Sequence, residues 1–259
     1  MMVDLLVITS CVMPPQQQFL KLVDSKERMR QTKQCLDFFI SSRLFRYIVI
    51  CDGSNVDCTD QYLKNKAENN DVRLESLFFL QNFEKVRLFG KGYGEGEIME
   101  HIVKNSILFE QSKFFIKITG RLSVNNIRSL LMHINTSSIY FNIFPARKLG
   151  CVDTRLYGMP TDKYEHYFLS AYKQVNDSQR RSFEYCFTDV LQVNKLKFIP
   201  FAYVPIFDGL SGTKNRRYSK DLVYWTEYIF NILGLMNTKI ASIAIFVSSL
   251  LSKVIDKVR

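Results

Sequence analysis

The stretch FFIKITGRL (residues 114–122) joins an apolar, strand-like run to a Lys, a Thr, a Gly and an Arg. Side chains of a strand alternate between two faces, so Lys117 and Thr119 share a face. Gly120 permits a tight bend that can turn Arg121 back toward them. A solvated strand end would explain one of these charges but not the cluster. We therefore interpret the cluster as a cationic clamp for a phosphate or diphosphate, in which the guanidinium binds in a bidentate manner.

This strand belongs to a series of strands that alternate with helices. Strand-like apolar runs occupy residues 5–11, 46–51, 73–80, 114–119 and 138–144. Asp24, with a Glu three residues later, has the pattern of a capping box and opens a helix, and residues 95–111 have a second helical pattern. Such alternation is typical of an α/β sheet with crossover helices. We therefore expect one α/β domain built around a sheet.

Ligands of such sheets bind beyond the carboxyl ends of the strands. The polar residues that we expect along this edge, and assign to the binding of a donor substrate, are Thr9, Ser10, Asp52, Lys117, Thr119 and Arg121. Asp52 directly follows a strand, in ICDGSN (50–55). Its carboxylate either bonds its own backbone in a turn or hydrogen-bonds a base or ribose, and its place in the sheet favours the second role.

A glycine repeat, GKGYGEGE (90–97), precedes the second helical pattern. It matches neither the dinucleotide fingerprint nor the P-loop. Alternate glycines still let backbone N–H groups approach an anion at a helix N-terminus, so we also expect Gly92, Gly94 and Glu95 to bind the donor. The alternative is that Glu95 and Glu97 cap the helix.

Two later segments carry further polar clusters. CVDTRLYG (151–158) has an Asp-Thr-Arg triplet after an apolar approach, and LSGTKNRRY (210–218) has a Ser-Gly-Thr turn followed by cations. The residues that we expect to bind a phosphate or an acceptor substrate are Arg155, Ser211 and Thr213. The alternatives are a local ion pair in the first segment and a surface loop in the second.

Composition limits the class of protein and its partners. The 259 residues carry a net charge of +10, with basic clusters at 214–220 and 253–259. There is no RNA-binding aromatic signature and no helix-turn-helix pattern, so we expect phosphates or an anionic membrane rather than nucleic acid. The six Cys include no C-x-x-C pair, and the start has too short an apolar run for a signal peptide. We therefore expect a cytosolic protein with reduced thiols and no structural metal.

Taken as ordered blocks, these motifs resemble a family of bacterial glycosyltransferases of capsule and O-antigen gene clusters. The blocks, which span residues 4–218, are SKERMRQTKQCLDFF, IVICDGSN, GKGYGEGEIMEHIV, FFIKITGRLSVNNI, VDTRLYG and GLSGTKNRRY. The resemblance implies a glycosyltransferase A-type fold, with one Rossmann-like domain at 1–218. It also implies a nucleotide-diphosphate sugar donor and a lipid-linked saccharide acceptor at the inner face of the bacterial plasma membrane.

The chain departs in one place from the pattern of that fold. In many enzymes of that fold, the strand corresponding to FFIKITG ends in an Asp-x-Asp that holds a divalent metal. No Asp-x-Asp occurs in this chain, and Lys117, Thr119 and Arg121 stand in its place. Fixed cations can stabilise a departing diphosphate, so we expect metal-independent catalysis with no cofactor. The alternative is that Asp153 acts as a lone metal ligand.

An inverting transferase needs a base that deprotonates the acceptor hydroxyl. Asp153 is the first candidate, because it holds the most motif-like acidic position. Glu184, in RRSFEYCF (180–187), which we predict to be helical, is the second. Its alternative role is that of an exposed helix carboxylate near Arg180 and Arg181.

The C-terminal residues 219–259 do not continue the alternation of strands and helices. From Trp225 onward, apolar residues recur at helical spacing, and the run IASIAIFVSSLL (240–251) is too short to span a membrane. We predict an appendage of amphipathic helices that either lies on an anionic membrane surface or mediates homo-oligomerisation. For the protein as a whole, the alternative to an enzyme is a non-catalytic basic scaffold that binds phosphates or membranes.

Overall fold

The computed structural model describes residues 3–15, 22–143, 151–210, 218 and 222–233, together with the single positions 240, 243, 244, 247, 248 and 251. Two of the residues predicted to bind phosphate or acceptor, Ser211 and Thr213, lie outside the described residues, as do the cations Lys214, Arg216 and Arg217.

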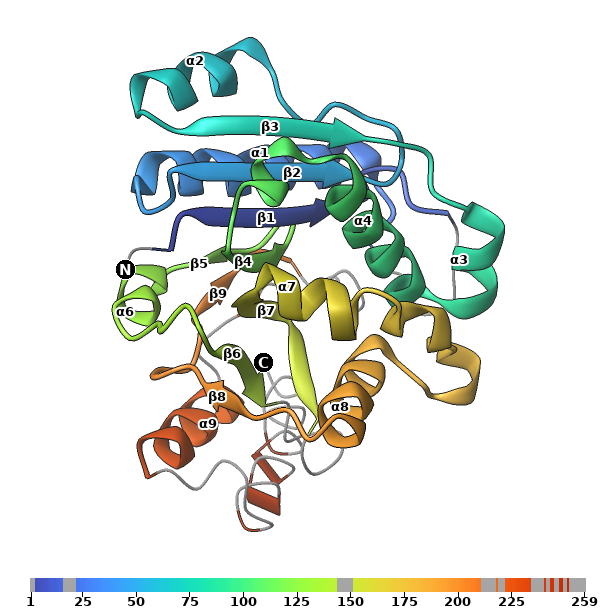
Figure 1. The fold of residues 1–259 in the computed structure, drawn as a ribbon, viewed down its shortest axis with the longest axis vertical. Helices are drawn as coiled ribbons and strands as arrows, with labels where there is room; N and C mark the ends of the chain where they lie inside the picture. The colour runs from blue at the N-terminus through green and yellow to red at the C-terminus, as the bar shows by residue number, and fades with distance from the viewer. Residues whose placement is uncertain are drawn as a thin grey trace.

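A seven-stranded sheet forms the centre of the molecule, with β3 at the top of Figure 1 and β8 near the bottom. The strand order is β3-β2-β1-β4-β7-β6-β8. The strands are β1 (Leu5–Ser10), β2 (Tyr47–Asp52), β3 (Arg73–Phe78), β4 (Phe114–Thr119), β6 (Ile139–Ile143), β7 (Val152–Pro160) and β8 (Phe198–Pro200). The first four strands along the chain in this sheet run parallel, and β7 is antiparallel to both β4 and β6. A separate pair consists of β5 (Ser123–Val124) and β9 (Phe207–Asp208).

Helices cover both faces of this sheet. The helices of the described residues are α1 (Ser25–Ser42), α2 (Gln61–Asn69), α3 (Phe83–Phe89), α4 (Lys91–Asn105), α5 (Ile107–Glu110), α6 (Ile127–Leu131), α7 (Thr161–Lys163), α8 (Phe183–Val193) and α9 (Leu222–Ile232), of which α7 and α9 belong to neither core cluster. Short π and 3-10 turns occupy Tyr164–Phe168, Ala171–Gln174 and Asp177–Gln179. One core cluster joins the sheet to α1, α2 and α6, and the other joins it to α4 and α8. The α/β fold predicted from the sequence is confirmed.

The central strands are apolar because both of their faces are covered. Leu5 and Val7 of β1 belong to the core on the α4 side, and Leu6 and Ile8 belong to the core on the α1 side. A strand buried on both faces has a continuous apolar run rather than an alternating one, which is why residues 5–11 could be recognised.

Helix α1 begins where the sequence predicts. The Asp24 carboxylate accepts hydrogen bonds from the backbone N–H groups of Lys26 and Glu27, at 2.9 and 3.3 Å. The Glu27 side chain does not return to the cap; it pairs with Arg30 and Gln31 instead. The predicted capping box is therefore half formed, with the cap present and its reciprocal bond replaced by bonds along the helix.

Helix α4 begins earlier than predicted, at Lys91, so the glycine repeat lies inside its first turns. A Cβ on Gly92 would lie 2.7 Å from Phe183 Cβ, and one on Gly96 would collide with Tyr172 Cβ. A Cβ on Gly94 would lie 2.5 Å from Gln81 Nε2. These glycines thus let α4 approach its neighbours closely, which corrects our assignment of Gly92 and Gly94 to donor binding.

The strand register brings the predicted polar residues to one edge of the sheet. Thr9 pairs with Thr119 across β1 and β4, and Ser10 pairs with Asp52 across β1 and β2. Because β7 is antiparallel to β4, it starts at this same edge. Asp153 therefore stands at the beginning of a strand, whereas the sequence pattern suggested the end of one.

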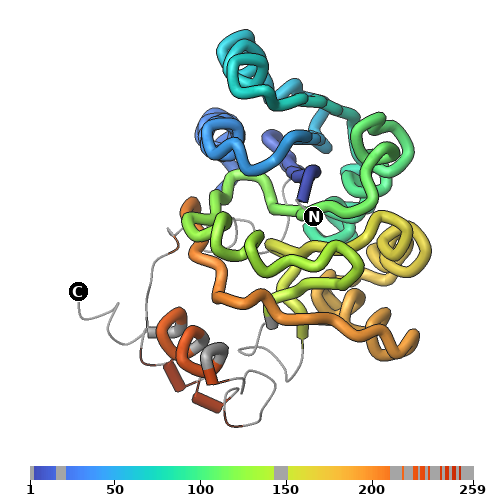
Figure 2. The backbone as a smooth tube through the Cα atoms, turned by 60° about the vertical axis from the view of Figure 1, so that its left-hand side comes forward, coloured from blue at the N-terminus to red at the C-terminus, as the bar shows by residue number. Residues whose placement is uncertain are grey.

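Helix α9 lies at the end of the molecule farthest from α2 in both views (Figures 1 and 2). Across the described part of the chain, no helix has the length and apolar character needed to cross a membrane.

Candidate functional site

The polar edge is divided by the sheet into two groups of side chains. Lys117 and Thr119 extend toward α4, where they meet Glu95. Arg121, which follows the bend at Gly120, lies on the other side with Cys35 of α1 in the lining of a groove. The predicted clamp of Lys117 with Arg121 is therefore wrong, because the two cations serve different faces of the sheet.

Lys117 is fully buried and has no exposed surface. Its ammonium contacts the Glu95 carboxylate and donates to Thr119 Oγ1 and to the Thr154 carbonyl, both at 3.0 Å. These acceptors use its three N–H bonds. Lys117 therefore cannot bind a phosphate directly, and it instead holds Glu95 and the start of β7 in place.

The charge of Lys117 depends on opposing effects. Burial lowers its pKa, to about 7, while the Asp153 and Glu184 carboxylates oppose that shift. The contact with the Glu95 carboxylate also favours the charged form of Lys117, so we treat the pair as ammonium and carboxylate. Glu95 also accepts from Thr119 Oγ1 at 3.2 Å, which fixes one of its two oxygens and leaves the side chain 21% exposed.

Asp153 is held by Arg155. The carboxylate accepts from Arg155 Nε at 3.0 Å and from Nη2 at 2.6 Å, and also from the Arg155 backbone N–H at 2.9 Å. The guanidinium stacks over the rings of Phe207 and Tyr218, at 4.4 and 5.1 Å. Burial opposes the charge of Arg155, but Asp153 and Tyr218 raise its pKa overall. Asp153 is 1% exposed and engaged by Arg155, so its surroundings favour the local ion pair over its assignment as the catalytic base and over the alternative of a lone metal ligand.

Glu184 is the second predicted base, and its surroundings differ. It lies in the first turn of α8, half-buried, and is close enough to Lys117 to raise the pKa of that ammonium. Among the described residues, its carboxylate makes no ion pair and no side-chain hydrogen bond. It does not pair with Arg181, whose guanidinium binds Asp189. Glu184 therefore remains free to accept a proton.

Asp52 has a structural role rather than the ligand-binding role that we predicted. It is 1% exposed, and its oxygens accept from the N–H groups of Val12 and Ser54, at 2.9 and 2.8 Å, and from Ser54 Oγ at 2.5 Å. Met13 N–H also donates to Ser54 Oγ. Asp52 thus ties the loop after β1 to the turn after β2, which was the alternative interpretation of this residue.

Thr9 and Ser10 end β1 on opposite faces. Ser10 Oγ lies 3.3 Å from Thr32 Oγ1 of α1. Thr9 Oγ1 is buried on the α4 side and has no hydrogen-bond partner among the described residues. Gly120 N–H donates to the Thr9 carbonyl at 2.7 Å, and a Cβ on Gly120 would lie 2.6 Å from that oxygen. The bend after β4 therefore needs its glycine.

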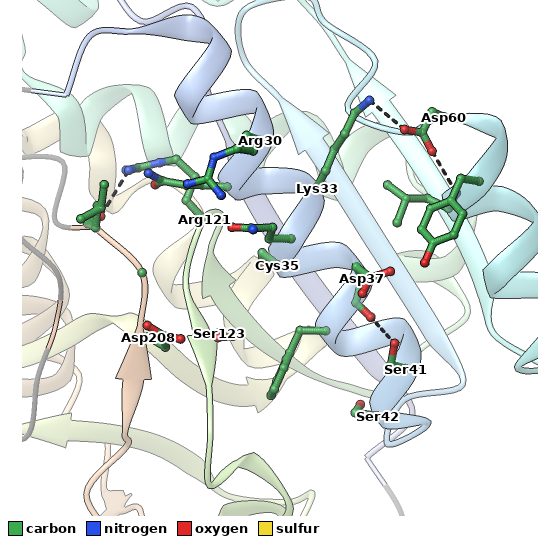
Figure 3. A pocket seen from close by; sticks show the side chains of 17 residues that line it. Arg30, Lys33, Cys35, Asp37, Ser41, Ser42, Asp60, Arg121, Ser123 and Asp208 are labelled. Carbon is green, nitrogen blue, oxygen red and sulfur yellow. Dashed lines mark hydrogen bonds and ion pairs between the residues drawn. The ribbon is translucent and has the colours of Figure 1, made fainter.

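On the α1 side, a groove of about 1070 Å³ runs along the helix between α2 and the β5–β9 pair (Figure 3). Its charged lining residues are Arg30, Lys33, Asp37, Asp60, Arg121 and Asp208. Arg121 donates to the Leu210 carbonyl at 3.4 Å, a long bond, and burial lowers its pKa. Lys33 and Arg30 are paired with Asp60 and Glu27, so Arg121 is the cation of this lining without a carboxylate partner among the described residues.

Arg28 is a buried cation of α1 near this edge that the sequence analysis did not consider. It is 5% exposed and donates to the Cys11 carbonyl from Nε and Nη2, at 2.8 and 2.6 Å, and to the Leu22 carbonyl at 3.1 Å. Burial and the nearby Arg121 lower its pKa, to about 10. The available signal was a cation within the buried stripe of α1, at helical spacing from Thr32 and Cys35.

The described residues do not fit a divalent metal in the place of an Asp-x-Asp. In that part of the chain, no three His, Cys, Asp or Glu side chains gather as a metal centre would require. Asp153 is engaged by Arg155, and Glu95 is engaged by Lys117. Metal-independent catalysis stays a prediction.

Comparisons with known proteins give structural likeness only. No protein-family model matches the chain, and no curated protein is similar in sequence. A protein assigned as a nucleotide-diphospho-sugar transferase of Desulfovibrio desulfuricans has 11% identity and a TM-score of 0.43, covering 77% of this chain and 80% of its own. The glycosyltransferase GlyE of Streptococcus pneumoniae has 6% identity and a TM-score of 0.48, covering 77% of this chain and 45% of its own.

A third structure, core-mannan synthase A of Aspergillus fumigatus in a Mn/GDP form, has 8% identity and a TM-score of 0.43. The match covers 84% of this chain and 78% of that one. Likeness at this level assigns no residue of the site and no activity to this chain.

Proposed function

We propose that the chain is a nucleotide-sugar-dependent glycosyltransferase of bacterial surface polysaccharide synthesis. The observation that carries the proposal is the meeting, at one sheet edge, of charged side chains from α4, β4, β7 and α8. These side chains are far apart in the sequence; Glu95 contacts the buried Lys117, and Asp153 and Glu184 lie near enough to raise the pKa of its ammonium. A scaffold that only binds anionic surfaces has no reason to bury such a network, whereas an active site needs its groups held rigidly.

The proposed reaction assigns one step to Glu184. Its carboxylate takes the proton of the acceptor hydroxyl while the hydroxyl oxygen bonds to the anomeric carbon of the donor sugar. The bond from that carbon to the diphosphate oxygen breaks, and the nucleotide diphosphate leaves with the electron pair. Glu95, oriented by Lys117 and Thr119, is placed to accept a hydrogen bond from a sugar or ribose hydroxyl.

The proposal includes a lipid-linked saccharide as acceptor and attachment to the inner face of the plasma membrane. An exposed apolar surface supports this part: Trp225, Ile229 and Leu233 of the α9 region are each about half exposed or more. Ile240 and Ile243 are also exposed. Such a surface suits the membrane interface at which a lipid-linked acceptor is found, and it also suits a contact between two copies of the chain.

The direct test measures release of nucleoside diphosphate from a panel of nucleotide sugars, with membrane lipid extracts as acceptor, in magnesium and again in EDTA. We expect one donor to be consumed in both conditions and the product to be extracted with the lipid. Consumption that requires magnesium would keep the transferase and reject metal independence. If no donor is consumed by the folded protein, the scaffold becomes the better explanation.

A further inference from the structure

We propose that strand β3 is the interface of a homodimer, in which it pairs with the β3 of a second copy and joins the two sheets into one. β3 ends the strand order of the central sheet and lies near the top of Figure 1, at the other end of the molecule from α9. This interface is independent of the proposed enzymatic function, and it is a different surface from the exposed apolar residues near the C-terminus.

The first step is the direction of the peptide groups in β3. Arg73 N–H donates to the Arg46 carbonyl at 2.9 Å, so the odd-numbered residues of β3 face β2. Because the direction of the peptide groups alternates along a strand, the N–H and C=O groups of Leu74, Ser76 and Phe78 face outward. Among the described residues, no backbone hydrogen bond uses these outward groups. The strand therefore presents three donors and three acceptors to a further strand.

The second step is that the two edges of the sheet differ in protection. At the other edge, β8 has three residues and ends in Pro200, which has no N–H to donate. β3 has six residues in continuous register with β2, without Pro, Gly, Lys or a bulge. Its acidic residue, Glu75, does not protect the edge, because its carboxylate accepts from Ser106 Oγ and from the N–H groups of Ile107 and Leu108. β3 is therefore the edge that is open to pairing.

The third step is the apolar character of the outward residues. Leu74 is half-buried and packs against the core cluster on the α1 side of the sheet. Phe78, four residues later, lies on the same face and is 46% exposed. A strand added at this edge would cover both side chains.

The fourth step is that β3 is complementary to itself. Two copies related by a two-fold axis place their β3 strands antiparallel to each other. With the axis at Ser76, Leu74 of each copy lies opposite Phe78 of the other, and all the outward N–H and C=O groups are paired. Apolar pairs directly opposite each other stabilise a sheet. An axis at Glu75 would instead place two acidic residues opposite each other, so the first register is favoured.

The fifth step is the local charge. The whole chain has a net charge of +10, which opposes the association of two copies. Residues 61–78, from α2 through β3, are balanced, with three basic and three acidic residues. These residues are Lys64, Lys66, Arg73, Glu68, Asp71 and Glu75. Two copies can therefore meet at this edge without the repulsion that the net charge would cause elsewhere.

The test is sedimentation velocity of the full chain over a range of concentrations. We expect the wild type to form a dimer. Ser76→Pro removes an outward N–H that has no bond within the molecule, and Phe78→Lys places a charge on the edge. Each should raise the dissociation constant of the dimer at least tenfold. Ile199→Lys is the matched control, because Ile199 is 45% exposed on the other edge strand, and it should change this constant by less than twofold.

Hydrogen exchange locates the interface and shows that the variants fold. In the wild-type dimer, the amide groups of Leu74, Ser76 and Phe78 should exchange at least tenfold more slowly than in the diluted monomer. Ser76→Pro and Phe78→Lys should keep the slow exchange of the central strand β1, and if only one of them folds, that variant decides.

Three results would overturn the inference. The first is a wild type that stays monomeric at every concentration. The second is a dimer with the same dissociation constant in the wild type and in the folded variants of β3. The third is a dimer that Ile229→Glu abolishes and Ser76→Pro does not, because the contact would then lie at the C-terminal apolar residues. None of these results depends on whether the chain consumes a nucleotide sugar.

Discussion

Asp153 and Glu184 are both carboxylates near Lys117, but they differ in what holds them. Asp153 is buried and bound in a bidentate manner, so Asp153→Asn leaves the Arg155 guanidinium without its counter-ion. Breaking a buried pair in this way costs about 3–5 kcal/mol. We expect the variant to lose stability of about that size in urea unfolding, at the low end because Arg155 is 24% exposed. Unchanged stability would show that the pair is not formed.

Glu184→Gln should give the opposite result. The side chain has no partner among the described residues, so we expect a change in unfolding free energy of about 0.5 kcal/mol or less. Loss of a general base reduces turnover by about 10²–10⁴-fold, and donor affinity should not change, since the Gln is isosteric. Steady-state turnover and calorimetry with the donor measure the two effects. A variant that turns over normally would remove Glu184 from the proposed step.

At the scale of single elements, α4 shows how packing overrides local preference. Gly is among the poorest helix formers, and four glycines within residues 90–96 hid the true start of this helix from the sequence analysis. The contacts of Gly92 and Gly96 with residues 172–183 explain why the helix forms there nonetheless. Those contacts join segments that are far apart in the sequence, so no local pattern could reveal them.

A pair of substitutions in α4 tests this explanation. Gly96→Ala would place its Cβ against Tyr172 Cβ, an atom next to the backbone that cannot move easily. Gly94→Ala would meet the far end of the Gln81 side chain, which is buried but more flexible than a Cβ atom. Both gain about 1 kcal/mol of helix propensity, and only the first is overpacked, at a cost of about 1–3 kcal/mol or more. We expect Gly96→Ala to lower the melting temperature and Gly94→Ala to leave the melting temperature unchanged or to raise it.

The reverse order, with Gly94→Ala the more destabilising, would contradict this account of the repeat. It would indicate that the turn at Gln81, rather than the contact with Tyr172, limits the approach of α4.

Other elements were predictable to different degrees. The bounds of β4 match the predicted run at 114–119, because Phe114, Phe115, Ile116 and Ile118 are apolar and buried. The direction of β7 could not be predicted, since an apolar run is the same for a parallel and an antiparallel strand. Whether Lys117 and Arg121 act together depended on the backbone at 120–121, where the left-handed residue sends the Arg to the other side. Residue types indicated the edge of the site, and only the three-dimensional structure shows which side chains are already engaged.

At the scale of the whole molecule, the described C-terminal residues present apolar side chains to the solvent. Exposed residues there are Trp225, Ile229, Leu233, Ile240, Ile243, Val247 and Leu251. Thr226 Oγ1 lies 2.6 Å from Ser248 Oγ, so α9 and the segment around residue 248 are in contact, and their exposed side chains belong to one region. Exposed apolar side chains on two segments in contact are typical of a site of interaction with a membrane or with protein.

Vesicle sedimentation tests whether this surface binds a membrane or a second copy of the chain. We expect the protein to bind vesicles that contain anionic lipid more strongly than zwitterionic ones, with binding that weakens as salt increases, because the chain has a net charge of +10. Burying an Ile side chain contributes about 1.5–3 kcal/mol, so Ile229→Glu should reduce vesicle binding about tenfold or more. Leu88→Glu is the control, because Leu88 is also more than half exposed but lies on α3, away from α9. If Ile229→Glu instead converts a dimer to a monomer in ultracentrifugation and leaves vesicle binding unchanged, the surface joins two copies of the chain, and the lipid-linked acceptor must be reached by another route.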